Sequence, residues 1–314
     1  MKTIILNKEA KRPAACVATI GFFDGVHLGH RYIINKVVTM ARHEGLGSMV
    51  VTFERHPRQV LQSDWCPQLL STLDEKVELL SQTGIDYLTV LRFDESLASL
   101  SACDFMHDIL QQQLGVKTLV TGYDNRFGHN RSEGFDDYVR YGEQMGMSVV
   151  QGEPFDAGTV RISSSVVRRL LTDGLVEQAA ACLGRPYSLT GKVVRGEHIG
   201  TGMGFPTANL QLSEEGKLVP ASGVYAVKVR LEGTSELLHG MMNIGSRPTF
   251  GLHSQTLETH IFHFDGDLYG QRLEVFFVSR LRSELKFESR EALMQQLASD
   301  VNQAEEAINK HTEI

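Results

Sequence analysis

The N-terminal half of the chain is organised around one stretch, Thr19-Ile20-Gly21-Phe22-Phe23-Asp24-Gly25-Val26-His27-Leu28-Gly29-His30. A short apolar run at 14–20 leads into its glycines, and apolar residues recur at helical spacing after His30. This pattern predicts a buried strand that turns directly into a helix. The free backbone N–H groups at such a helix start, together with the helix dipole, form an anion site. We therefore expect phosphate chemistry at this turn.

Two histidines, His27 and His30, lie where that helix should begin, so both can face the same anion. Gly29 between them lets the backbone approach closely. This suits attack by a phosphate oxygen on the α-phosphorus of ATP, which needs charge stabilisation and little covalent help. An isolated pair at this spacing more often caps or packs, but the glycines and the preceding strand favour a nucleotide site. Zinc is not expected, because no third or fourth ligand lies nearby in the sequence.

The composition of the chain is that of an ordinary soluble protein, with 42% hydrophobic and 22% charged residues. A length of 314 residues is long for one compact core and favours two domains. The formal net charge of −7 argues against a large nucleic-acid-binding surface. A single bound nucleotide is compatible with that charge.

The cysteines are widely spaced, which favours buried thiols in a reducing compartment over disulfides or a zinc site. They are Cys16, Cys66, Cys103 and Cys182. The apolar patch near the N-terminus is too short for a signal peptide, and no run is long enough to span a bilayer. We expect a cytoplasmic protein with small-molecule partners and no nucleic acid or membrane partner. The sequence leaves a homo-oligomer possible.

Strand-like and helical patterns alternate through the first half, which predicts an α/β domain with a parallel sheet. The strand candidates are 16–20, 48–53, 87–92, 118–121 and 148–151, and the helical windows are 30–44, 73–82, 101–114 and 134–146. Thr72 and Glu75 fit a capping box, and Ser101 fits an N-cap.

Polar, basic and glycine-rich segments follow the predicted strands, at 54–58, 122–131 and 161–165. The last of these opens a helix that contains Arg168 and Arg169. Ligands of parallel sheets bind beyond the carboxyl ends of the strands. The segments therefore converge on one predicted binding edge.

Near residue 184 the helical periodicity ends for most of the remaining chain. Strand patterns at 224–231, 237–243, 258–264 and 273–278 are separated by turn residues, which predicts a small antiparallel barrel. A helical pattern from 290 to about 310 should pack against it. We therefore predict domains at 1–183 and 184–314.

The second half offers its own candidates for phosphate chemistry. Thr207 and Asn209, stiffened by Pro206, present neutral oxygens that can share a Mg²⁺ with water and nucleotide phosphates. Glu258 begins a predicted strand, and its carboxylate can accept a proton from a primary hydroxyl that attacks the γ-phosphate of ATP. Taken alone, such a turn is more often structural, and such a glutamate more often faces solvent.

Four segments of the first half, taken in order, resemble the nucleotidyltransferase module of bacterial bifunctional riboflavin kinase/FAD synthetases. They are TIGFFDGVHLGH at 19–30, TFERHPRQVL at 52–61, LVTGYDNRFGHNRSEGF at 119–135 and ISSSVVRRLL at 162–171. That module is Rossmann-like and is marked by His-x-Gly-His.

The resemblance implies a role for each matching residue. ATP phosphates are contacted by His27 and His30, and the pocket is shaped by Gly21, Phe22, Asp24 and Gly29. The second phosphate-binding segment comprises Ser164, Ser165 and Arg168. Asn125 approaches the flavin and the transferred phosphate as a catalytic residue. Alone, Arg168 also fits a solvated helix face, the serines an N-cap and Asp24 a tight turn.

The second half resembles the riboflavin kinase domain, a six-stranded barrel with a terminal helix. The matching segments are GFPTANL at 204–210, SGVYAVKV at 222–229, NIGSRPTFG at 243–251, LETHIFHFDGDLYG at 257–270 and LRSELKF at 281–287. The resemblance implies magnesium and nucleotide contacts at Thr207 and Asn209 and a catalytic base at Glu258. Where the family often has arginine, this chain has Thr201, and Arg195 or Arg247 are the candidates to compensate.

Together, the two resemblances imply an enzyme that phosphorylates riboflavin to FMN with MgATP and then adenylylates FMN to FAD. Three alternatives stay open at this point. The adenylyl acceptor is another phosphorylated vitamin; only one of the two activities is retained; or the protein is a flavin- or nucleotide-binding regulator. Retention of His27, His30, Thr207, Asn209 and Glu258 together favours the enzyme.

Overall fold

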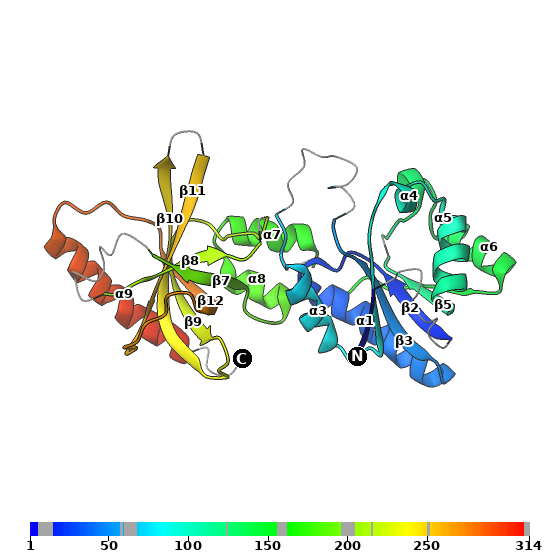
Figure 1. The fold of residues 1–314 in the computed structure, drawn as a ribbon, viewed down its shortest axis with the longest axis horizontal. Coiled ribbons are helices and arrows are strands. Elements are labelled where there is room, and N and C mark those ends of the chain that lie inside the picture. Colours follow the sequence, from blue (N-terminus) through cyan, green and yellow to red (C-terminus); the bar gives the residue numbers. More distant parts are fainter. Residues whose placement is uncertain are drawn as a thin grey trace. The chain divides into compact units, whose positions relative to one another are not determined.

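The computed structural model describes residues 1–5, 15–56, 59, 68–123, 125–155, 162–195, 205–214, 216–249 and 252–310. The chain divides into two compact units, Met1–Ser164 and Ser165–Ile314 (Figure 1). Each unit has its own sheet and its own hydrophobic core.

In the described part of the first unit, six strands form a sheet in the order β1-β4-β3-β2-β5-β6, and every pairing is parallel. The strands are β1 (Lys2–Ile5), β2 (Cys16–Ile20), β3 (Gly47–Phe53), β4 (Tyr87–Leu91), β5 (Val116–Thr121) and β6 (Ser148–Gln151). The predicted parallel sheet is confirmed. The prediction missed the edge strand β1, which pairs with β4.

The described helices of the first unit include all four predicted windows and three short helices outside them. They are η1 (Asp24–Val26), α1 (Leu28–Glu44), α3 (Leu73–Ser81), α4 (Glu95–Ala98), α5 (Ala102–Asp104), the π-type helix η2 (Phe105–Gln113), η3 (His129–Arg131) and α6 (Phe135–Met145). Thr72 and Glu75 form the predicted capping box, and Ser101 caps α5 as predicted.

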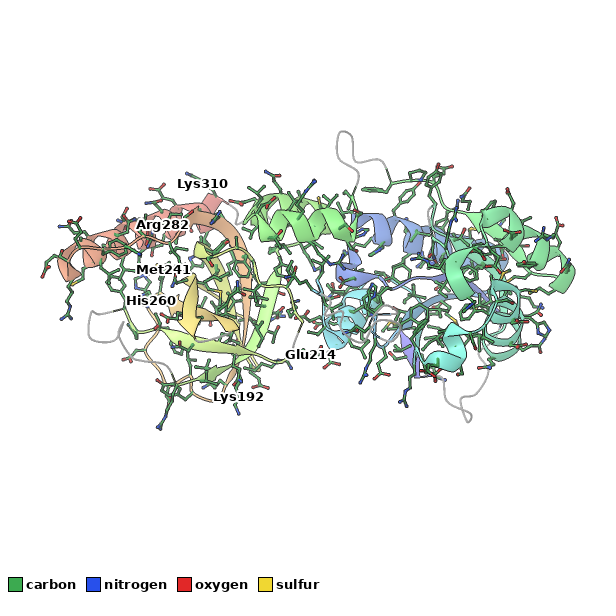
Figure 2. All side chains as sticks on the ribbon, turned by 90° about the horizontal axis from the view of Figure 1, so that it is seen from above. Lys192, Glu214, Met241, His260, Arg282 and Lys310 are labelled. Carbon is green, nitrogen blue, oxygen red and sulfur yellow. The ribbon has the colours of Figure 1, made fainter. Side chains whose placement is uncertain are left out.

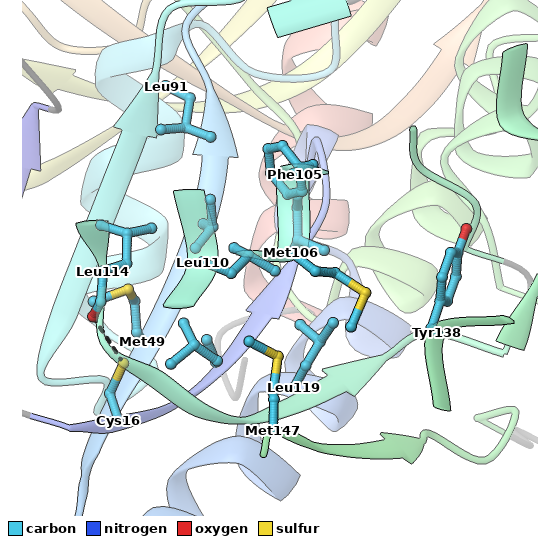
Figure 3. Close-up of a cluster of buried hydrophobic side chains, with 14 of the residues drawn as sticks. Cys16, Met49, Leu91, Phe105, Met106, Leu110, Leu114, Leu119, Tyr138 and Met147 are labelled. Carbon is cyan, nitrogen blue, oxygen red and sulfur yellow. Dashed lines mark hydrogen bonds between the residues drawn. The ribbon is translucent and has the colours of Figure 1, made fainter. Parts of the chain in front are cut away.

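Helices cover both faces of this sheet, and the alternation along β2 shows how. Cys16, Ala18 and Ile20 join the core cluster that includes residues of η2 and α6 (Figure 3). Val17 points to the opposite face and packs with Val37 of α1. A sheet buried on both sides in this way holds the ends of its strands rigidly, which positions the loops that follow them.

The second unit begins with α7 (Ser164–Thr172) from Ser165 onward, continues with α8 (Val176–Leu183), and then forms a closed barrel. Among its described residues the barrel has six strands in the order β10-β11-β8-β7-β12-β9, all antiparallel. They are β7 (Ser188–Val194), β8 (Ala208–Leu212), β9 (Gly223–Leu231), β10 (Leu237–Thr249), β11 (Leu252–Ile261) and β12 (Arg272–Arg282).

The predicted barrel is confirmed, with two differences in its strands. The local pattern missed β7 and β8. Glu258 was predicted to begin a strand, but it lies near the end of β11, which starts at Leu252. The polar run Ser254–Gln255–Thr256 hides the first part of β11 from a hydrophobicity pattern, whereas its pairing with β10 extends the strand through it.

The terminal helix α9 (Arg290–Lys310) packs on β9, β10 and β12, as predicted. Ala304 and Ile308 of α9 are fully buried against Ala226 and Met241 of the barrel. Arg282 of β12 forms a bidentate ion pair with Asp300 of α9, at 2.7 Å for the shortest N–O distance, and the Asp300 side chain is fully buried. No helix in the described part of the chain is long and apolar enough to cross a membrane.

Candidate active sites

The histidine turn joins the end of β2 to the start of α1. His27 caps α1, because its Nδ1 accepts a hydrogen bond of 3.2 Å from the backbone N–H of His30. The two rings are stacked, with centroids 3.6 Å apart and an interplanar angle of 18°. The prediction that both imidazoles share one side of the helix start therefore agrees with the geometry, and His27 also serves as the cap.

Small residues and strained backbone make this turn possible. A Cβ on Gly29 would lie 3.2 Å from the His27 ring, and one on Gly21 would lie 3.1 Å from the Phe23 ring. Phe23 and Val26 adopt positive φ values of 54° and 41°, which residues other than glycine rarely do. Each such conformation costs about 1–3 kcal/mol of folding free energy and persists where surrounding contacts hold it.

Asp24 supplies several of those contacts. Its buried carboxylate accepts hydrogen bonds from the backbone N–H groups of Leu70 and Ser71 at 2.9–3.1 Å, and Ser71 Oγ accepts one from Gly25 N–H at 3.0 Å. Asp24 thus ties the turn to the segment at residues 70–71. Ser164 Oγ donates to the Asp24 carbonyl at 3.1 Å, which brings the start of α7 to the same turn.

The electrostatics of the turn favour a neutral imidazole. Burial, and after it the charges of His27 and Lys76, hold the pKa of His30 well below its usual value of 6.5. Among the described residues, Nδ1 of His30 is buried and has no hydrogen-bond partner. A phosphate bound near this ring would favour its protonated form.

A cavity of about 490 Å³ opens beside the turn. Of the residues given roles from the sequence, Gly21, Phe22 and Asn125 line it, whereas Asp24 and Gly29 do not. Asn125 Nδ2 donates to the Ile20 carbonyl at 2.6 Å, which holds the loop after β5 against the end of β2. Many of the further lining residues are aromatic or basic: Phe53, Phe93, Phe105, Phe127, His56, Arg126, His129 and Arg131. The sequence placed segments 54–58 and 122–131 at the binding edge but gave none of these residues an individual role. Such walls suit a flat aromatic ring that carries negative charge.

The register of three barrel strands brings the side chains of the barrel site together. Asn209 of β8 pairs with Glu258 of β11, and Glu258 pairs on its other side with Asn243 of β10. Directly opposed residues of antiparallel strands point to the same face. Asn209, Glu258 and Asn243 therefore form one polar row across the barrel, with Thr207 just ahead of β8.

Thr207 lines two cavities of the barrel unit. One, of about 170 Å³, is also lined by Pro206 and Thr259, and the other, of about 320 Å³, is also lined by Glu258 and Asn243. Thr207 is therefore the predicted residue that the two cavities share.

The larger barrel cavity has an apolar and a charged side. Figure 2 labels Met241, His260 and Arg282 among its lining residues, and α9 contributes Leu293 and Leu297. His260 was not predicted; its Nδ1 donates to the Pro206 carbonyl at 2.8 Å and so anchors the turn that carries Thr207.

Comparisons with known proteins identify the family of each half of the chain. Residues 9–166 match the FAD synthetase family model, and residues 183–308 match the riboflavin kinase family model. The chain is 39% identical over 296 residues to the bifunctional riboflavin kinase/FMN adenylyltransferase of Escherichia coli K12, with 94% of each chain covered. The chain belongs to this bifunctional family.

Other relatives support the same assignment. The Haemophilus influenzae protein of the same name is 36% identical, with 94% of each chain covered. A crystal structure from Streptococcus pneumoniae, described as a macrolide-efflux protein, superposes with a TM-score of 0.88 at 30% identity and covers 96% of this chain and 97% of that one. That likeness shows a shared fold, and the efflux description belongs to that protein. The predicted family is confirmed.

The donors in the barrel fit the magnesium ion that the family implies. Thr207 offers a hydroxyl, and Asn209, opposite Glu258 in register, an amide oxygen. Hard oxygen ligands of this kind suit Mg²⁺ when water and phosphate complete the set. Of the other predicted residues, Ser165 and Arg168 lie on α7 within the second compact unit, and Thr201 and Arg161 lie outside the described residues.

Proposed function

We propose that this protein makes both flavin nucleotides, as a riboflavin kinase in its second half and an FMN adenylyltransferase in its first. One observation supports the proposal: this chain of the bifunctional family carries candidate groups for both reactions. His27 and His30 are stacked in the turn whose residues Gly21 and Phe22 line an aromatic cavity, and Glu258, which pairs with Asn209, lines a barrel cavity together with Thr207.

In the first half, the aromatic cavity holds the flavin ring of FMN and His27 and His30 face the phosphates of ATP. An oxygen of the FMN phosphate attacks the α-phosphorus of ATP. A new phosphorus–oxygen bond forms, the bond to the bridging oxygen breaks, and pyrophosphate leaves. The nucleophile belongs to FMN, so the chain supplies only position and charge stabilisation.

The supporting residues of this site have separate tasks. Gly21, Phe22, Asp24 and Gly29 give the turn its shape, and Asn125 fixes the loop that faces the transferred phosphate. Ser164 shares the turn through its contact with Asp24. The assignment of Ser165 and Arg168 to a second phosphate-binding segment rests on the sequence resemblance.

In the second half, Glu258 accepts the proton of the riboflavin 5′-hydroxyl as its oxygen attacks the γ-phosphorus of ATP. The bond from the γ-phosphorus to the bridging oxygen breaks, and ADP leaves with FMN as the other product. Thr207 and Asn209 would hold Mg²⁺, which neutralises charge on the nucleotide phosphates. Arg282, fixed by Asp300, and His260 shape the cavity that receives riboflavin.

We further propose the functional boundary at residue 183, because the two family models end at 166 and begin at 183. We assign the protein to the cytoplasm, where ATP and riboflavin are available and thiols stay reduced. The described cysteines fit this assignment, since Cys16, Cys103 and Cys182 are all free.

A single assay tests the proposed function. Purified protein is incubated with riboflavin, ATP and Mg²⁺, and the flavin products are separated by chromatography. FMN and FAD should both form. Formation of FMN without FAD would show that the first half is inactive. If FAD formed only when FMN was supplied in place of riboflavin, the second half would be inactive. Formation of neither flavin nucleotide would contradict the proposal.

A further inference from the structure

Lys76 is a buried lysine on α3 whose side chain reaches beneath the histidine turn. It is only 2% exposed, and lysines are rarely buried unless they are paired. Its Nζ donates to the carbonyl of Phe22 at 3.2 Å and to that of Phe53 at 2.9 Å. One ammonium therefore joins the segments that end β2 and β3.

Both carbonyls belong to residues whose rings form the wall of the aromatic cavity. The Phe22 ring lies over the same ammonium, with Nζ 4.1 Å from the ring centroid. The Phe53 ring meets Phe93, another lining residue, edge to face at 5.5 Å. Loss of the ammonium would free two adjoining parts of that wall together.

The contact also supports the strained part of the turn. Phe22 immediately precedes Phe23, whose φ is 54°, and the Phe22 carbonyl is held twice, by Lys76 and by Thr52 Oγ1 at 3.1 Å. Strained backbone keeps its geometry only when its neighbours are fixed. Lys76 thus acts on the segment that leads to both histidines.

Among the described residues, few charged groups lie near the ammonium of Lys76. Asp24 in η1 and His30 in α1 interact with it electrostatically, and His27 is stacked on His30. Burial lowers the pKa of Lys76 from 10.5 to about 8, and Asp24 offsets part of that effect. A cation is therefore kept in a place where burial disfavours it.

We propose that Lys76 is a positioning residue for adenylyl transfer, whose ammonium holds the Phe22 and Phe53 walls and the histidine turn in the geometry that binds FMN. This inference rests on the proposed function of the first half. A lysine that only stabilised the fold would contribute to unfolding free energy without making FMN affinity depend on its charge.

The test compares two variants of the full chain, Lys76→Met and the control Lys36→Met. Lys36 also donates to a backbone carbonyl, that of Gln151 at 3.1 Å, but Gln151, unlike Phe22 and Phe53, does not line the cavity. FMN affinity is measured by quenching of flavin fluorescence at pH 7, 8 and 9, together with kcat and KM for FAD synthesis. Riboflavin kinase activity of the same samples reports on the second half.

Lys76→Met should weaken FMN binding by about tenfold and raise KM for FMN more than it lowers kcat, because a misplaced wall acts first on binding. Wild-type affinity should fall as the pH rises through about 8, where Lys76 loses its proton, and the variant should show no such dependence. Ordinary histidine, phosphate and arginine groups titrate outside this window. Lys36→Met and the kinase rate should stay within about twofold of wild type.

The inference is overturned if Lys76→Met binds FMN as wild type does, or if Lys36→Met weakens binding equally. If Lys76→Met does not fold, the wild-type protein decides, because unchanged FMN affinity between pH 7 and 9 contradicts the role of the charge. A wild-type protein that neither binds FMN nor makes FAD would instead refute the proposed function of the first half.

Discussion

The histidine turn and the barrel site, which we propose both bind ATP phosphates, are built in opposite ways. The turn takes its residues from one contiguous segment, bends it through positive φ angles at Phe23 and Val26, and fixes it with buried groups. The barrel site uses regular strands and takes Asn209, Glu258 and Asn243 from three of them by register alone. The first site therefore depends on backbone shape as well as on side-chain identity, whereas the second depends on side chains that regular strands bring together.

The largest expected effect is the loss of the proposed base. Glu258→Ala should reduce FMN formation from riboflavin by about 10²–10⁴-fold, because no group remains to accept the hydroxyl proton. FAD formation from supplied FMN should be unchanged. Exposed Glu236 on the same barrel is the matched control, and Glu236→Ala should retain both activities. Equal loss of both activities in Glu258→Ala would break the separation of the sites.

The reciprocal variant is His30→Ala. FAD formation should fall by about 10²–10³-fold, because a group that stabilises phosphate charge is removed, while the kinase rate stays unchanged. His43→Ala, on an exposed position of the same helix, is the control. Chromatography of both half-reactions measures the result, and a normal rate of FAD synthesis would exclude His30 from the site.

The addition of one methyl group tests whether catalysis at the first site depends on the backbone shape of the turn. Gly29→Ala places a Cβ 3.2 Å from the His27 ring and should lower kcat for FAD synthesis by about tenfold, since small displacements of catalytic groups are costly. Gly134→Ala is the matched control, because a Cβ there meets nothing within 4 Å. If both variants behaved alike, the close approach at Gly29 would have no functional meaning.

The smallest effect concerns the pH dependence of stability. The pKa of His30 lies well below 6.5 in the folded protein, so below pH 6.5 the unfolded chain binds a proton that the folded chain does not. Stability from this group is complete above pH 6.5 and is lost as the pH falls, by at most about 1.4 kcal/mol per pH unit. Urea unfolding followed by fluorescence of the single tryptophan, Trp65, measures it. His30→Asn should have the shallower dependence, and equal slopes would contradict the burial of a neutral His30.

The same contrast explains which parts the sequence could predict. The strand–turn–helix around His27 and His30 is local, so its period, glycines and caps are visible in one segment. The row through Asn209, Glu258 and Asn243 depends on pairing between distant strands. Side-chain chemistry and the family resemblance both made Asn209 and Glu258 candidates, but nothing local predicted that they pair. Asn243 lacked any local signal.

Residues that distant segments bring to the sites, to support or to line them, also could not be predicted from the sequence. Lys76 stands in a helix whose pattern shows only an ordinary polar position, and its burial arises from the packing of α3 under η1. The aromatic wall combines Phe53, Phe93, Phe105 and Phe127 from four separate segments. The strands β7 and β8 were missed because turn residues flank them and each buries only a few side chains.

The central claim, two independent active sites in one chain, is tested most directly by mixing two inactive proteins. Glu258→Ala alone cannot supply FMN, and His30→Ala alone cannot consume it, so neither should convert riboflavin to FAD. An equimolar mixture with riboflavin, ATP and Mg²⁺ should produce FAD, because FMN released by one protein is the substrate of the other. FAD from either variant alone, or loss of both half-reactions in a folded variant, would contradict the account.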